Sequence, residues 1–183
     1  QAHAVVVARP TANPGDIRIE APDIDLESDL DDLPRDHPIT LAIHGAIRAL
    51  GITVPPAFLL RVTSTIALAA GLGSSAAVSV AMIRAVTTFL GNPLPPDHVS
   101  SLAYEVEKKQ HGTPSGIDNT VIAFAKPIYF QRDQPFQILK VAELLTLIIA
   151  DSGYQSSTAE VVADVRQNWQ KNPAHYEAIF DAI

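Results

Sequence analysis

The chain contains no cysteine among its 183 residues, and its basic residues are outnumbered by its acidic ones. Without cysteine it has no disulfide framework, no thiolate zinc site and no cysteine nucleophile, which fits a reducing compartment. Lys and Arg number 13 against 20 Asp and Glu, so the formal net charge is −7. That balance argues against a surface built to neutralise nucleic-acid phosphates or anionic lipid, and we expect no nucleic-acid or membrane partner.

The sequence also lacks an uninterrupted apolar run of membrane-spanning length. Its longest stretch without a charged residue, 62–83, is broken by six Ser and Thr residues and two glycines. A spanning helix needs about 20 predominantly apolar residues. Residues 1–5 show no basic segment or cleavage pattern of a signal peptide. Because 47% of the residues are hydrophobic, we expect a packed core. The lack of cysteine and of a signal-peptide pattern leads us to expect a cytoplasmic location.

What is present predicts an α+β fold without repeats or regular βαβ alternation. Strands are expected at 5–8 and 17–20, paired as a hairpin across the turn residues Asn13-Pro14-Gly15. The acidic segment 23–32 is expected to be a solvated loop. Further strands are predicted at 58–64, 121–130 and 139–150.

Apolar residues at helical spacing predict amphipathic helices at about 38–50, 78–89, 97–110, 158–169 and 173–180. Gly51 stands where a residue just past a helix end belongs. His44 lies on the first of these helices, where we interpret it as a residue at the edge of the core rather than a ligand.

Residues 69–77, Ala-Ala-Gly-Leu-Gly-Ser-Ser-Ala-Ala, lie between a predicted strand and a predicted helix. Glycines let the backbone approach an anion closely, and unpaired N–H groups and the dipole at a helix start favour negative charge. Serine oxygens there can donate to phosphate or bind Mg²⁺. The segment matches neither a P-loop nor the dinucleotide-binding glycine pattern, and an ordinary helix cap with glycine for packing is the alternative.

Residues 107–119 form a second polar, turn-rich segment between two apolar elements, which is typical of a functional loop. Asp118, expected at the edge of a following strand, could accept a proton from a substrate hydroxyl during phosphoryl transfer. Glu107 is expected in the last turn of a helix, a position that carboxylates disfavour unless something such as a cation holds them there. The alternative for Glu107 is an exposed residue paired with Lys108 or Lys109.

Together the two segments resemble the GHMP kinases, the superfamily named for galactokinase, homoserine kinase, mevalonate kinase and phosphomevalonate kinase. Residues 71–77, Gly-Leu-Gly-Ser-Ser-Ala-Ala, are similar to the central nucleotide motif of the superfamily. Residues 111–119, His-Gly-Thr-Pro-Ser-Gly-Ile-Asp-Asn, are similar to the segment that distinguishes its mevalonate-phosphorylating branch. Matches continue through residues 151–166, so the resemblance covers most of the chain.

The resemblance implies a set of site residues. Around the ATP phosphates and nucleotide it places Ser64, Ala69, Ala70, Gly71, Leu72, Gly73, Ser74, Ser75 and Ala76. It implies Ser75 and Glu107 as Mg²⁺ ligands, and Asp118 as the catalytic base that takes the proton from the mevalonate hydroxyl. Near the substrate it places His111, Ser115, Gly116 and Thr158. Thr158 can also serve as a helix cap.

The implied fold is a domain similar to domain 2 of ribosomal protein S5 at residues 1–145, followed by the start of a ferredoxin-like domain at 146–183. Family members also carry an early strand motif, whose lysine lies near the catalytic aspartate, and a third, late glycine-rich motif; neither is visible in this sequence. Ala67 stands where the family usually has proline. We therefore expect the middle of a larger two-domain kinase, without its first strands and truncated in its second domain.

The implied activity is ATP-dependent phosphorylation of mevalonate to 5-phosphomevalonate, with Mg²⁺, in isoprenoid precursor biosynthesis. Two alternatives stay open: another GHMP small-molecule kinase, such as one acting on phosphomevalonate, and a non-catalytic nucleotide-binding fragment. The resemblance allows a homodimer but leaves the oligomeric state open.

Overall fold

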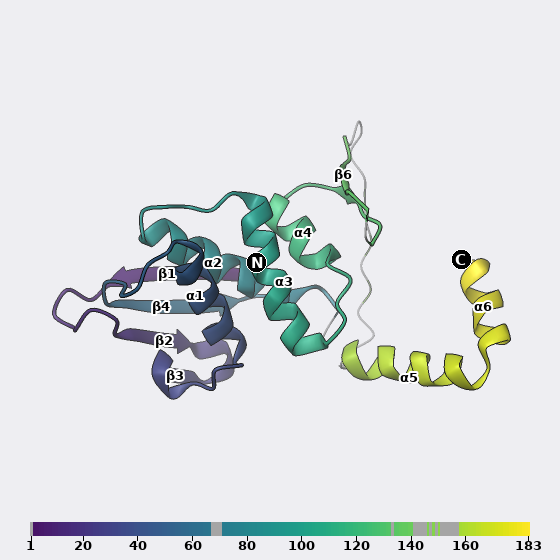
Figure 1. The fold of residues 1–183 in the computed structure, drawn as a ribbon, viewed down its shortest axis with the longest axis horizontal. Helices are drawn as coiled ribbons and strands as arrows, with labels where there is room; N and C mark the ends of the chain where they lie inside the picture. The colour runs from purple at the N-terminus through teal and green to yellow at the C-terminus, as the bar shows by residue number, and fades with distance from the viewer. Residues whose placement is uncertain are drawn as a thin grey trace.

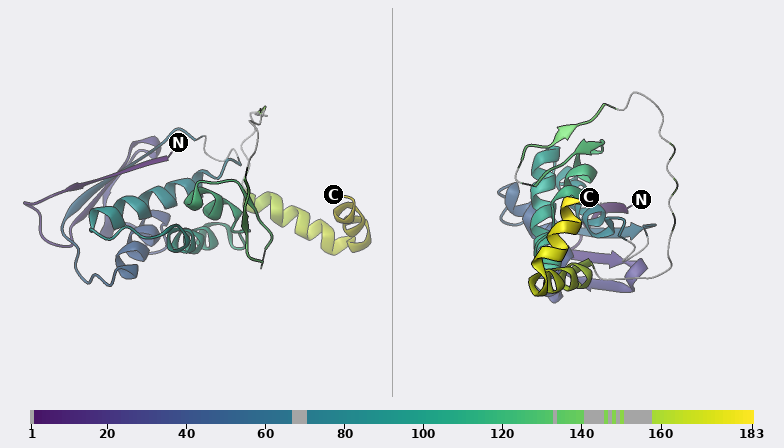
Figure 2. Two further views of the ribbon diagram at one scale, coloured as in Figure 1. Left: turned by 90° about the horizontal axis from the view of Figure 1, so that it is seen from above. Right: turned by 90° about the vertical axis from the view of Figure 1, so that its right-hand side faces the viewer.

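The computed structural model describes residues 2–66, 71–132, 134–140, 146, 148, 150 and 158–183. A four-stranded sheet carries helices on one of its faces, and two further helices extend away from this body toward the C-terminus (Figures 1 and 2). Its elements, with two short 3₁₀ helices written η, are β1 (Ala2–Ala8), β2 (Ile17–Ala21), η1 (Pro22–Ile24), β3 (Leu26–Asp29), η2 (Leu30–Asp32), α1 (Pro38–Ala49), β4 (Phe58–Ser64), α2 (Ser74–Phe89), α3 (Pro96–His111), α4 (Ile117–Phe124), β5 (Ile128–Tyr129), β6 (Gln137–Ile138), α5 (Thr158–Lys171) and α6 (Pro173–Asp181).

The strand order in the large sheet is β1-β4-β2-β3. β4 is antiparallel to β1 and parallel to β2, and β2 is antiparallel to β3. The predicted hairpin between the first two strands is therefore wrong, because β4 lies between them. β4 and β2 are the inner strands, and Phe58, Leu60 and Val62 on one face of β4 are all buried.

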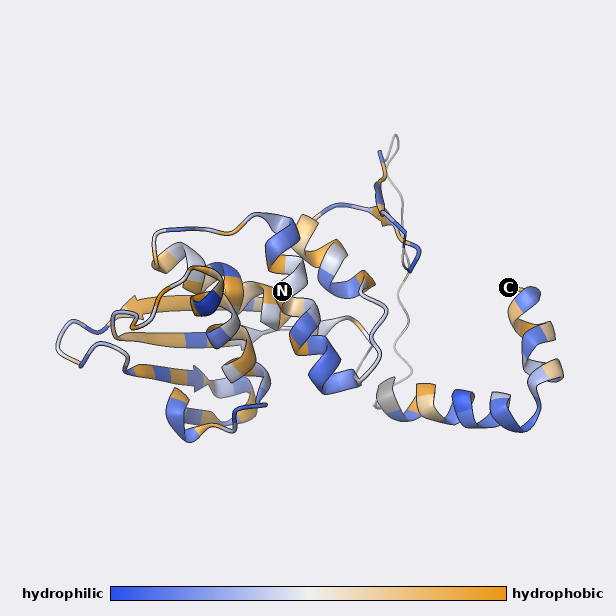
Figure 3. Cartoon of the chain, viewed as in Figure 1, coloured by the Kyte–Doolittle hydropathy of each residue, from blue (hydrophilic) through white to orange (hydrophobic). Residues whose placement is uncertain are grey.

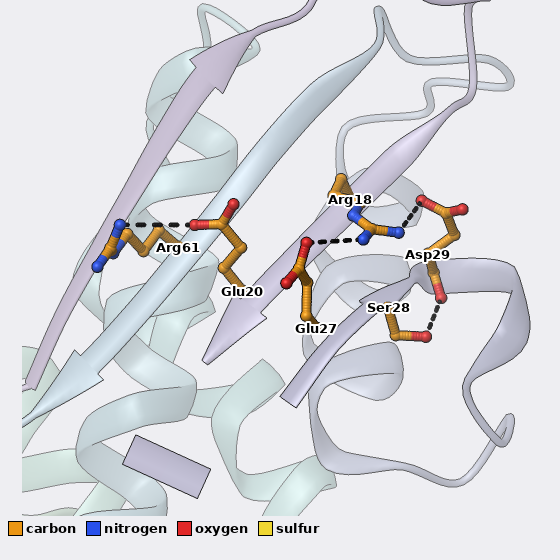
Figure 4. Close-up of polar contacts among 6 residues, drawn as sticks. All are labelled: Arg18, Glu20, Glu27, Ser28, Asp29 and Arg61. Atoms are coloured by element: carbon orange, nitrogen blue, oxygen red, sulfur yellow. Dashed lines mark hydrogen bonds and ion pairs between the residues drawn. The ribbon is translucent and has the colours of Figure 1, made fainter. Parts of the chain in front are cut away.

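The acidic segment 23–32 was expected to be a loop, but it contains the edge strand β3. Its exposed carboxylates neutralise a basic residue on the neighbouring strand: Arg18 reaches Glu27 at 2.8 Å and Asp29 at 3.4 Å (Figure 4). Hydrogen bonds and charge from these two carboxylates raise the pKa of Arg18. The carboxylates are thus accounted for by strand pairing on the solvent side of the sheet.

The helices predicted at 38–50, 78–89 and 97–110 and the strand predicted at 58–64 are confirmed as α1, α2, α3 and β4. α1 and α2 both end in a Schellman arrangement, with Gly51 at φ +67° and Gly91 at φ +81° just past the helix. The inward side chains of α2, among them Met82 and Ile83, pack with Ile19 and Leu60 of the sheet in one core.

The strand predicted at 121–130 is wrong over most of its length, since residues 117–124 form the helix α4 and only 128–129 are extended. A glycine in the left-handed region, Gly116 at φ +91°, begins the helix, and Thr120 Oγ1 donates to its carbonyl at 2.6 Å. The strand expected at 139–150 falls largely outside the described residues.

The two C-terminal helices are confirmed as α5 and α6. In Figure 3 apolar colour marks the beginning of α5 and parts of α6, and Val161, Val165 and Trp169 on α5 are exposed. Asn172 stands at the start of α6, although its side chain makes no capping hydrogen bond. Among the described helices, none combines the length and the hydropathy that crossing a membrane requires.

Candidate active site

The glycine-rich turn leads directly into α2. Gly71 and Gly73 have φ of +70° and +65°, a conformation that side chains disfavour. A Cβ on Gly71 would meet nothing within 4 Å, so backbone conformation rather than packing requires glycine there. No side chain caps the helix at Gly73. The first N–H groups and the positive end of the helix dipole are therefore available to an anion.

Ser75, in the first turn of α2, is tied to the end of α3. Its hydroxyl donates to Oε1 of Glu107 at 2.5 Å and also contacts the side-chain amide oxygen of Gln110. Glu107 is only 5% exposed, and its Oε2 lies 3.6 Å from Nε2 of His111. The alternative of an exposed Glu107 paired with a neighbouring lysine is wrong, because Lys108 instead pairs with Glu105 at 2.6 Å. A buried carboxylate thus faces the phosphate-type turn.

Asp118 lies in the first turn of α4 rather than at the edge of a strand. A buried polar cluster anchors this turn to α3: Asn119 Nδ2 donates to the carbonyl and hydroxyl oxygens of Ser100 at 3.1 and 2.9 Å. The carboxyl group of Asp118 packs over the glycine turn, since a Cβ on Gly73 would lie 3.5 Å from Asp118 Cγ. An exposed carboxylate is thereby held beside the start of α2, where the dipole of α4 also favours its charge.

These groups line one cleft of about 920 Å³. Of the residues expected at the site, it is lined by Gly71, Leu72, Gly73, Ser74, Ser75, Glu107, His111, Ser115, Gly116 and Asp118. Ser64 and Ala76 are not part of the lining. The backbone N–H of Ser64 donates to Asp23 at 2.5 Å, and Ala76 is fully buried inside α2. Ala69, Ala70 and the side chain of Thr158 lie outside the described residues.

Sequence reasoning missed several residues at the cleft or its rim, among them Gln110, Arg132 and Arg166. Gln110 and Arg166 line the cleft, and Arg166 of α5 donates to Thr113 Oγ1 at 3.5 Å. Arg132 supports the loop from outside, donating to the carbonyl oxygens of Pro114 at 2.6 Å and Thr113 at 3.4 Å. Helical spacing from Val162 on the same face of α5 could have indicated Arg166, whereas no local signal marks Arg132.

The oxygen atoms of Ser75 and Glu107 fit a magnesium ion. Mg²⁺ prefers octahedral oxygen ligands at about 2.0–2.1 Å, so adjacent ligands lie about 2.9 Å apart, close to the 2.5 Å between these two atoms. In the described part of the chain, no group of three or more His, Asp or Glu side chains could hold a metal. A pair of protein ligands is the usual number when substrate phosphates and water complete the shell.

Comparison with known proteins identifies the family. Residues 39–126 match the family described as GHMP kinases N terminal domain. The chain belongs to the GHMP kinases. It is 39% identical over 145 residues to the mevalonate kinase of Thermococcus sibiricus and 37% identical over 145 residues to that of Pyrococcus horikoshii. Each match covers 79% of this chain and 41% of the relative, so this GHMP kinase chain spans less than half the length of these curated relatives.

The GHMP kinase fold is seen in solved structures as well. The structure described as L. major mevalonate kinase in complex with R-mevalonate superposes with a TM-score of 0.73 at 23% identity, covering 98% of this chain and 55% of that one. The predicted α+β GHMP kinase fold is therefore confirmed. GHMP kinases use ATP, and the cleft at the start of α2 is the described feature suited to its phosphates.

Proposed function

We propose that this chain is the catalytic part of an ATP-dependent mevalonate kinase, which transfers the γ-phosphoryl group of ATP to the mevalonate hydroxyl and yields 5-phosphomevalonate and ADP. The observation that carries the proposal is the convergence, on one cleft, of the uncapped start of α2, the buried carboxylate of Glu107 and the carboxylate of Asp118. We infer the substrate from the relatives of Thermococcus sibiricus and Pyrococcus horikoshii, which are both named mevalonate kinase.

Phosphoryl transfer requires positioning and charge stabilisation more than covalent chemistry from the protein. The backbone N–H groups at Gly73 to Ser75 would hold the phosphate oxygens. Asp118 is the proposed base, because its carboxylate lies against Gly73 and so can reach a hydroxyl group that approaches a phosphate bound at the turn. The proton leaves the substrate oxygen for Asp118 as the new O–P bond forms.

Ser75 and Glu107 are the proposed ligands of Mg²⁺, which when bound would neutralise charge on the phosphates. The tie between Ser75 and Glu107 keeps these two oxygens together in the absence of nucleotide. Glu107 is buried and has His111 beside it, and together these two features restrict its carboxylate to the side of α3 that faces the cleft.

The carboxylate of mevalonate needs a cationic partner. Arg166 is the only Lys or Arg among the described lining residues of the cleft, and it makes no ion pair with another described residue. We assign it to the substrate carboxylate. Ser115 and Gly116, in the loop that Arg166 and Arg132 support, would shape the substrate pocket, and His111 and Thr158 would lie near it.

The proposal includes the domain organisation implied by the motifs: residues 1–145 as the ATP-binding domain and 146–183 as the beginning of a second one. It also includes a cytoplasmic location and a homodimer. Analytical ultracentrifugation of the chain tests the dimer, since a single species of 19.6 kDa would contradict it.

A coupled ADP-release assay with mevalonate, phosphomevalonate, galactose and homoserine tests the activity. Turnover with mevalonate is expected. Turnover with only one of the other three compounds would show that this compound, and not mevalonate, is the substrate. ATP binding without any turnover would favour a nucleotide-binding fragment.

The assignment of the base is tested separately with Asp118→Asn, which should lower kcat by about 10²–10⁴-fold while leaving ATP affinity nearly unchanged. Asp97→Asn is the matched control, because Asp97 also lies in the first turn of a helix but does not line the cleft. Wild-type turnover in the Asp118 variant would disprove the assignment.

A further inference from the structure

A second cleft, of about 900 Å³, lies between η2, α1 and α3. It shares no lining residue with the proposed active site. α3 contributes Val106 and Lys109 to this cleft but Glu107 and Gln110 to the other, so the two clefts open on different faces of one helix. A ligand held here would be distinct from the nucleotide and its acceptor.

The charge of this second cleft runs against that of the chain. Arg35, Arg48 and Lys109 line it in a protein with a net charge of −7. Within the described structure, none of these three side chains makes a hydrogen bond or an ion pair. Of the two carboxylates in the wall, Glu105 is already paired with Lys108 at 2.6 Å, which leaves Asp31. The cleft therefore has uncompensated positive charge.

The rest of the wall combines apolar side chains with a buried hydroxyl group. Leu33, Leu41 and Leu102 contribute apolar surface. Thr40 also lines the cleft, is only 2% exposed, and its hydroxyl has no hydrogen-bond partner among the described residues. Buried hydroxyl groups nearly always have a partner, so an orphan one in the wall of a cleft points to a ligand.

His44 was expected at the edge of the core, but it is exposed and lines this cleft. Its imidazole adds a donor or acceptor beside the three cations. The sequence pattern of α1 explains this position, since His44 and Arg48 are four residues apart and share one helix face with Leu41.

We propose that the second cleft is a binding site for a small organic anion that carries an apolar portion, such as an alkyl phosphate or a carboxylate of similar size. The cations Arg35, Arg48 and Lys109 hold the anionic group, and the hydroxyl group of Thr40 donates a hydrogen bond to that group. The leucines contact the apolar part. This site does not depend on the kinase assignment, because it uses none of the residues of the proposed active site.

The test is a titration of the ¹⁵N-labelled chain with hexyl phosphate, followed by amide chemical shifts. Hexanol and inorganic phosphate serve as probes that lack the charge or the apolar part. We expect the largest shift changes at Thr40, His44, Arg48 and Lys109, with hexyl phosphate binding at least tenfold more tightly than either control probe. Shift changes centred on 71–75, or equal binding of hexanol, would overturn the proposal.

Variants identify the groups responsible. Arg48→Gln combined with Lys109→Gln should weaken hexyl phosphate at least tenfold, because both side chains are exposed and their removal disturbs no described contact. Lys126→Gln combined with Lys171→Gln changes the net charge equally at exposed positions outside the cleft and should leave affinity unchanged. Equal affinity of the two double variants refutes the site.

Discussion

The contact between Ser75 and Glu107 joins the start of α2 to the end of α3, and a double-mutant cycle can measure its contribution to stability. The variants are Ser75→Ala, Glu107→Gln and the two combined. Ser75→Ala removes the hydroxyl donor, whereas Glu107→Gln removes the charge but nearly preserves side-chain volume. The coupling free energy is the part of the two effects that is not additive.

The structure sets the expected magnitude. The acceptor is a carboxylate that is 5% exposed, and the oxygen atoms are 2.5 Å apart. A hydrogen bond to a charged group contributes about 1.5–3 kcal/mol, and solvent does not replace it at a buried site. We therefore expect Ser75→Ala to lower the free energy of unfolding by about 2 kcal/mol, and a coupling of about 1.5 kcal/mol with Glu107→Gln.

The assay is urea unfolding followed by far-ultraviolet circular dichroism, without nucleotide or Mg²⁺. Gln110→Ala provides the control cycle, because Gln110 also contacts Ser75 but is exposed. Its coupling to Ser75→Ala should be about 0.5 kcal/mol. A coupling with Glu107 no larger than that with Gln110 would show that burial of the carboxylate does not strengthen the contact, and the reasoning would fail.

Three further predictions concern single residues. Burial lowers the pKa of His37, whose Nδ1 accepts a hydrogen bond from the N–H of Ile39 at the start of α1, so the unfolded state binds more protons and the free energy of unfolding should fall as the pH drops below about 6.5. Urea unfolding between pH 7 and 5 should show a smaller loss of this free energy in the His37→Asn variant, and equal losses would contradict this. Gly73→Ala and Gly91→Ala should each lower the free energy of unfolding by about 1 kcal/mol, because both positions have positive φ. Only the methyl group at Gly73 would contact Asp118, so only Gly73→Ala should reduce turnover in the ADP-release assay, and equal turnover in both variants would argue against the position of Asp118. Thr40→Val should raise the free energy of unfolding by about 1 kcal/mol in urea by removing an unpartnered buried hydroxyl, whereas a loss would indicate a hydrogen bond that the native state makes.

Local patterns predicted α1, α2 and α3 because their signals are contained within a few residues. In α2, the positions of Val78, Met82 and Val86 repeat at helical spacing, and Gly91 marks the end. The pairing of strands has no such local signal. Nothing near β1 or β2 in the sequence shows that β4 will lie between them.

The same limit explains the error at α4. The run from Val121 to Phe124 is apolar and short, so that its pattern alone fits a buried strand or one side of a short helix. Contacts that are distant in sequence, from Ser100 to Asn119 and Thr120, favour the helix. This helix then turns Asp118 toward the glycine turn.

At the site, the motif resemblance identified residues that the structure brings together, but local reasoning could not assign their environment. Glu107 has two lysines beside it in sequence, which suggested an exposed ion pair, whereas its burial depends on how α2 and α3 cross. Arg166 belongs to the last third of the chain and reaches the cleft only through the placement of α5.

The central position of β4 has a consequence for the order in which the chain becomes structured. β1 ends at Ala8 and its partner among the described strands, β4, begins at Phe58, so this pairing cannot form until residues 9–57 have also been made. At about 5–20 residues per second, synthesis of that interval takes roughly 3–10 s. During this time Val5 and Val7 lack the neighbouring strand that β4 provides, and this pairing forms only by a long-range step, which is slow compared with helix formation. Early chaperone contact with residues 2–8 is the expected result in a cell.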